Sequence, residues 1–66
     1  MGYSVIQVET GKVVYENLED VALLNDIVGN ISKFAKDFPK MDSEIIVTNG
    51  AMPVYSGLVS AWEPLT

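Results

Sequence analysis

The sequence contains no cysteine and no histidine, and its four basic residues are all lysines. These absences exclude disulfide bonds, thiolate nucleophiles, histidine general bases and the common soft-metal sites. Without histidine, cysteine or arginine, few groups remain that activate a nucleophile or stabilise a charged transition state. We therefore expect a protein that is not an enzyme and that uses no metal and no cofactor.

Long apolar runs are also missing. No run approaches the ~20 residues that span a bilayer, and the N-terminus has no basic region followed by an apolar one. The sequence therefore indicates neither membrane insertion nor secretion, and we expect a cytoplasmic protein, with which the lack of cysteine is compatible. Nine acidic residues against four lysines give a net charge of −5, so the backbone of a nucleic acid is an unfavourable partner.

Apolar residues, by contrast, make up 48% of a chain of only 66 residues. A chain of this length is expected to form one domain, residues 1–66, whose core is near the lower limit for independent stability. So much apolar content in so small a protein predicts that apolar surface remains exposed on the monomer. Association into a homodimer or a higher homo-oligomer would cover that surface.

The N-terminal part of the chain predicts a β-hairpin. Apolar and polar residues alternate along the first strand, and this pattern predicts that Ile6 and Val8 face the core. Gly11 lies where a short hairpin loop needs a left-handed residue, and a second run of β-formers follows it. Residues 2–16 are therefore interpreted as an antiparallel hairpin.

One long helix is predicted next. Apolar residues recur at three- and four-residue steps over residues 19–37, with Phe34 widening the apolar stripe. Asn17 or Asp20 is suited to cap the first turn. Pro39 biases the residue before it out of helical geometry, so the helix is expected to end by that point.

A strand, a turn and a second helix are predicted over residues 44–62. Three consecutive β-branched residues, 45–47, favour a strand that is buried on both faces, and Asn49 with Gly50 permits a sharp turn. Pro53 fits the first position of a short helix. The predicted fold is thus α+β with the order ββαβα: a three-stranded mixed sheet in the order 2-1-3, packed against one long and one short helix.

The same segment suggests a binding site. A strand, a glycine turn and a helix N-terminus present free amides and a positive helix end to an anion, although this connection is also very common without any ligand. The predicted ligand-binding residues are Asn49, Gly50, Ala51, Met52, Pro53 and Val54. The third strand would be an open edge, and the tyrosine and tryptophan suit a half-buried surface. The predicted interface residues are Ile45, Val47, Tyr55 and Trp62.

Residues 46–61, IVTNGAMPVYSGLVSA, resemble the central motif of the small ring nucleases of type III CRISPR systems, which bind cyclic oligoadenylates. The matching positions are Asn49, Gly50, Pro53, Val54 and Tyr55. The resemblance implies dimers and a turn that holds ligand phosphate. Where that family has a histidine implicated in cleavage, this chain has alanine and tryptophan, so the resemblance implies binding without nuclease activity.

Two functional hypotheses follow, and both are non-catalytic. The first is a small homo-oligomeric binding module that holds a cyclic nucleotide or another phosphate compound at residues 49–53, although the acidic charge counts against it. The second is a small acidic protein-interaction module, such as a phage-type inhibitor or adaptor, that acts through an apolar face. Size, charge and apolar content favour the second hypothesis. An enzyme is the least favoured class.

Overall fold

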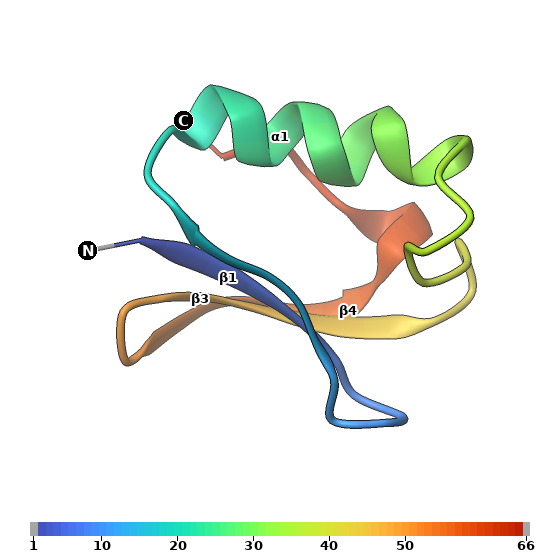
Figure 1. Cartoon of the computed structure of the whole chain (residues 1–66), viewed down its shortest axis with the longest axis horizontal. Helices are drawn as coiled ribbons and strands as arrows, with labels where there is room; N and C mark the ends of the chain where they lie inside the picture. Colours follow the sequence, from blue (N-terminus) through green and yellow to red (C-terminus); the bar gives the residue numbers. More distant parts are fainter. Residues whose placement is uncertain (1, 66) are drawn as a thin grey trace.

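The computed structural model describes residues 2–65 as a four-stranded antiparallel sheet with a helical layer on one face (Figure 1). The elements in chain order are β1 (Tyr3–Gln7), β2 (Val13–Leu18), α1 (Val21–Gly29), the 3-10 turn η1 (Ile31–Lys33), β3 (Glu44–Asn49), β4 (Met52–Leu58) and the 3-10 turn η2 (Val59–Ala61). The strands are ordered β2-β1-β3-β4. The α+β class agrees with the prediction, but the arrangement within it differs.

The predicted N-terminal hairpin is confirmed. The amide of Gly11 donates to the carbonyl of Gln7 at 2.8 Å, and the amide of Gln7 donates to the carbonyl of Lys12 at 2.8 Å. The predicted facing of the first strand is wrong, however, because Val5 is the fully buried residue and Val8 is 43% exposed. Both sets of alternate residues on β1 are partly apolar, so the alternation does not show which set faces the core.

The helix is shorter than predicted. Its N-cap is Asp20, whose side chain accepts from the Ala22 amide at 2.9 Å. Asp20 was one of the two predicted caps. The helix ends at Gly29. The hydroxyl of Ser32 donates to the carbonyl of Val28 at 2.5 Å, which is the acceptor that an α-helix would give to the Ser32 amide. The chain tightens into η1, and Phe34, predicted to pack on the core, is 84% exposed.

The predicted second helix is wrong, because the chain returns from the turn as strand β4. Gly50 and Ala51 are the two central residues of the β3–β4 turn, and Gly50 alone has a positive φ, +61°, which is typical of a type II′ hairpin turn. The three-stranded mixed sheet with two helices is therefore corrected to four antiparallel strands and one helix. The antiparallel pairing of β1 with β3 is confirmed, but β3 is an internal strand and not an edge.

The core lies between α1 and one face of the sheet. Its buried apolar residues come from the helix, the sheet and the connections: Val5, Leu24, Ile27, Val28, Phe38, Ile45, Val47 and Val59. The last described residues return along the helix, where Asn25 and Leu65 exchange two hydrogen bonds. The Asn25 Nδ2 donates to the Leu65 carbonyl at 2.7 Å, and the Leu65 amide donates to the Asn25 Oδ1 at 2.8 Å. Within residues 2–65, no helix has the length and apolar character that a membrane crossing requires.

Candidate functional site

The predicted anion-binding turn is the tip of a β-hairpin. Asn49 ends β3 and pairs with Met52, which begins β4. The amide of Gly50 donates to the carbonyl of Gly2 at 3.0 Å, so this donor is already used inside the protein. Residues 49–54 do lie together, as predicted, but as a turn that holds the N-terminal segment.

Pro53 lies in a strand and not at a helix N-terminus. It pairs with Thr48, and the register shifts between Val47 and Thr48, so Val54 is an extra residue in a β-bulge. Proline is accepted here because β4 is an edge strand, where a missing N–H removes no ladder bond. Strand β4 follows this turn directly, so no helix begins there and the geometric basis of the anion hypothesis is absent.

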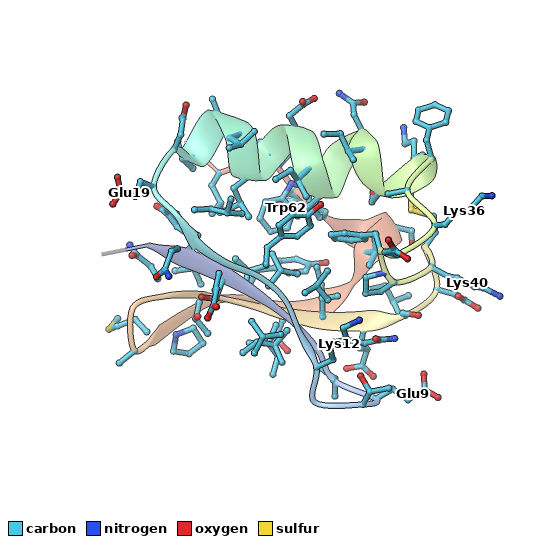
Figure 2. The ribbon with its side chains drawn as sticks, in the orientation of Figure 1. Glu9, Lys12, Glu19, Lys36, Lys40 and Trp62 are labelled. Atoms are coloured by element: carbon cyan, nitrogen blue, oxygen red, sulfur yellow. The ribbon has the colours of Figure 1, made fainter. Side chains whose placement is uncertain are left out.

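The four predicted interface residues lie on the helix-covered side of the sheet. Ile45 and Val47 are fully buried in the core of a single chain, so neither is available to a second molecule. Tyr55 and Trp62 are half-buried and pack edge to face, with ring centroids 4.9 Å apart and an angle of 77° between the planes. Figure 2 shows Trp62 between the helix and the sheet. These residues form internal packing.

The two polar atoms of this aromatic pair differ in environment, because the Tyr55 hydroxyl bonds at the surface and the Trp62 Nε1 is buried. The hydroxyl of Tyr55 donates to the Leu58 carbonyl at 2.5 Å, and the buried Nε1 of Trp62 has no hydrogen-bond partner in the described part of the chain. Burial raises the pKa of the Tyr55 hydroxyl, and the nearby Glu63 carboxylate raises it further. The pair therefore keeps a neutral phenol and offers no ionised group for chemistry.

The opposite face of the sheet is not covered by α1 and is partly apolar. Val13, Ile6, Ile46 and Ser56 stand side by side in one row across all four strands. The neighbouring row brings Glu44 opposite Leu58, with Val8 joined to Glu44 by a hydrogen bond from its amide to the Glu44 carbonyl at 3.2 Å. Figure 1 shows that α1 covers only the other face.

We call the five apolar residues of these rows the outer-face patch. Its members are Ile6, Val8, Val13, Ile46 and Leu58. Val8, Val13 and Leu58 are 43%, 48% and 41% exposed, and the two isoleucines are half-buried by their neighbours. Large contiguous apolar surfaces on soluble proteins are often contact sites, so this patch is the candidate surface that the structure offers. The sequence contained a signal for it, since apolar residues occupy both sets of alternate positions on β1 and β3.

Charged side chains are arranged around this patch in a regular way. Two acidic residues lie at its margin. Glu44 belongs to the outer rows. Tyr15 faces the core opposite Val5, so the next residue, Glu16, lies on the outer face. The lysines gather at the end of the molecule where β1 ends and β3 begins, which is also where Glu44 lies, and Figure 2 shows Lys12, Lys36 and Lys40 there.

The lysine end is electrically balanced. An open hollow of about 710 Å³ is lined there by Lys36 and Lys40 together with the carboxylates of Glu9, Asp37, Asp42 and Glu44. Lys12 and Lys33 line adjoining hollows. Five exposed acidic residues lie elsewhere and account for the whole net charge of −5: Glu16, Glu19, Asp20, Asp26 and Glu63. A hollow lined by both signs does not select an anion, so it gives no support to a phosphate site.

Comparisons with protein-family models, with curated proteins and with solved structures found no match. The residues of this chain must therefore carry the functional argument. Within the described residues, no three or more acidic side chains lie close enough to hold a metal ion. The most distinctive surface that remains is the outer-face patch.

Proposed function

We propose that this chain is a small acidic protein-interaction module without catalytic activity, and that it binds a partner protein through the outer-face patch. One observation carries the proposal: an apolar row crosses three of the four strands, β2, β1 and β3, on the face that α1 does not cover. Burying apolar area contributes about 25 cal/mol per Å² removed from water, which is the main driving force in most protein association.

The partner is expected to present an apolar surface flanked by basic side chains. Glu16 lies on the same side of the sheet as the patch and away from the lysines, while Glu44 reaches the patch from the end of the molecule where Lys36 and Lys40 lie. Complementary charge at the rim of an interface speeds encounter and fixes orientation more than it raises affinity. We therefore expect the association rate to fall as salt is added, with a smaller effect on dissociation.

The proposal includes a cytoplasmic location and a role without catalysis. A cytoplasmic location fits a chain that has no cysteine, although it does not require one. A non-catalytic role fits the same composition, since Ser56 and Ser60 have no histidine beside them to act as a base.

A substitution at the centre of the patch tests the proposal. Ile46→Lys places a charge in the middle of the row, while Leu23→Lys makes the same change at a residue of α1 that is 45% exposed. Proteins retained by the wild type from the native host should be purified and titrated against both variants. We expect Ile46→Lys to weaken binding at least tenfold and Leu23→Lys to leave it unchanged.

The folded state of each variant must be checked by circular dichroism and amide NMR. Ile46 is half-buried on the outer face, so its substitution should leave the core packing intact. If a folded Ile46→Lys variant binds the purified partner as tightly as the wild type does, the outer-face patch is not the binding surface.

A further inference from the structure

Strand β4 has one side of its backbone unpaired. It is the last strand of the sheet, and Figure 1 shows it at the margin beyond β3. Beyond the ladder with β3, the only hydrogen bond to its backbone in the described chain is the one from the Tyr55 hydroxyl to the Leu58 carbonyl. An edge of this kind can accept a further strand.

The register shows which residues point their backbone groups outward. Along a strand, the backbone N–H and C=O of successive residues point alternately to the neighbour on one side and to the neighbour on the other. The Glu44 carbonyl accepts from the Val8 amide, so the backbone groups of Glu44 and Ile46 point toward β1. The backbone groups of Ile45, which lies between them, point toward β4. Ile45 lies opposite Gly57, whose backbone groups therefore point toward β3. The neighbouring residue, Ser56, must then direct its N–H and C=O away from the sheet.

The side chains around Ser56 fit a second copy of the same strand. If two β4 strands pair antiparallel about a two-fold axis at Ser56, the regular ladder covers residues 55–57 of each copy, and the bulge residue Val54 of one copy comes close to Leu58 of the other. Val54 is 39% exposed and Leu58 is 41% exposed in the single chain. The symmetric pairing would cover both.

Charge also favours pairing at this edge. Strand β4 contains no charged residue, and the acidic residues that cause the net charge lie on β2, before and on α1, and after η2. Two copies that each carry −5 repel one another least along an uncharged edge. The other edge, β2, carries Glu16 and leads directly to Glu19 and Asp20, so a second copy would meet like charges there.

We propose that two copies of this chain pair along β4, with Ser56 at the two-fold axis, to form one continuous eight-stranded sheet. The N–H and C=O of Ser56 in each copy exchange hydrogen bonds with those of the other. Because the two-fold axis of such a sheet is perpendicular to it, both outer-face patches lie on the same side. The inference concerns β4 alone and does not depend on the proposed partner protein.

Single-cysteine variants test the geometry directly, because the natural chain has no cysteine. A hydrogen-bonded antiparallel pair has its Cα atoms about 5.5 Å apart, within the usual disulfide range. We expect Ser56→Cys to form a disulfide-linked dimer under mild oxidation at least tenfold faster than Glu16→Cys, which is equally exposed on the other edge. Equal rates for the two variants would overturn the proposal.

The mass of the protein in solution gives the second measurement. Sedimentation of the wild type over a range of concentrations should show a dimer, and Ser56→Ala should keep it because the backbone N–H remains. Ser56→Pro removes that N–H without removing a bond to β3, and it should weaken the dimer at least tenfold. A wild type that remains monomeric at the highest concentrations, or a folded Ser56→Pro variant that dimerises like the wild type, would contradict the proposal.

Discussion

The two edges of the sheet are built in different ways. Strand β2 meets β1 with two register shifts, and Asn17 near its end has a φ of +60°. Glu16 on this strand is exposed, and two more acidic residues follow it. Strand β4 has one register shift, one proline and no charged residue. Irregular pairing and charge are the usual means by which proteins prevent an edge strand from pairing with another chain.

The difference indicates that β2 is protected along most of its length, whereas on β4 the proline and the bulge lie at residues 53 and 54 and leave residues 55–58 uncharged and regularly paired. A strand added to β2 would have to follow a twisted and acidic backbone, whereas a strand added to β4 would meet Ser56 with Val54 and Leu58 on either side. A protein of 66 residues has a small core that gives little stability, and apolar residues that stay exposed add nothing to it. The contrast is therefore most simply explained if β4 has a partner.

The largest loss of stability is expected for a substitution on the internal strand β3. Val47 is fully buried on β3, and a lysine there would place an unpaired charge in the core, at a cost of several kcal/mol. We expect Val47→Lys to be unfolded by circular dichroism. Thr48→Lys changes the next residue, which is half-buried on the outer face, and should remain folded. A folded Val47→Lys variant would contradict the register.

On the β4 edge, a substitution of Gly57 is expected to lower the stability of the protein most. A Cβ added there would lie 3.1 Å from the Tyr55 hydroxyl oxygen, and the φ of Gly57 is +158°. Gly57→Ala should therefore displace the tyrosine and destabilise the protein by about 2 kcal/mol, as overpacking typically does. Urea denaturation measures the change, with Ser56→Ala as the matched control. Equal midpoints for the two variants would show that Tyr55 moves without cost.

On the β2 edge, Asn17 should show a smaller effect of backbone strain. A β-branched side chain is unfavourable at a positive φ, so Asn17→Val should cost about 1 kcal/mol, while Asn17→Gly should be neutral or stabilising. Glu16→Val at the preceding exposed position serves as the control in the same urea titration. If Asn17→Val were as stable as Asn17→Gly, the left-handed conformation would not persist in solution.

The pH dependence of stability should report on Tyr55. Burial, with a further contribution from Glu63, raises its pKa above the usual 10.0, so the folded state holds the phenol proton more tightly than the unfolded state does. The stabilisation is complete below pH 10.0 and is lost as pH rises through the raised pKa. Between about pH 9 and about pH 11, the urea midpoint of the wild type should fall more than that of Tyr55→Phe. Parallel curves would count against the environment that the structure gives the hydroxyl, next to the Leu58 carbonyl and near Glu63.

The smallest effect is expected at the hairpin tip between β3 and β4. Millimolar cyclic oligoadenylate should leave the amide NMR signals of Gly50, Ala51 and Val54 in place, because the Gly50 donor is already bonded and no described helix ends there. Inorganic phosphate at the same concentration is the control for weak ionic effects. Shifts confined to these three signals would restore the anion hypothesis against the structure.

Local signals in the sequence predicted the position of the first hairpin and the start of the helix, but not the facing of β1 or the end of α1. Gly11 placed the first turn, Asp20 was one of two predicted caps, and the pairing of β1 with β3 followed from the topology. Residues 52–62 were misassigned because the bulge at Val54 interrupts the strand alternation. From Tyr55 onward the inward residues include a glycine and the outward residues include Leu58, so the polar contrast that identifies a strand is missing.

The residues of the outer-face patch were not identified from the sequence for a related physical reason. Sequence patterns locate a core by assuming that the other face is polar, and on this sheet it is not. Ile6 and Val8 were therefore assigned to the core, while Val5 fills it. Places where sequence rules fail consistently are often sites of function, and here the failure coincides with the surface that we propose binds a partner.

The double hydrogen bond between Asn25 and Leu65 has a consequence for hydrogen exchange. The Asn25 side chain both donates to and accepts from the backbone of Leu65, forty positions away, as a residue of a neighbouring strand would. Amides in irregular segments usually exchange within the time of local opening, whereas those tied to the core exchange only when a larger unit unfolds. The Leu65 amide should accordingly exchange together with helix α1, as part of one cooperative unit that Asn25→Ala would divide.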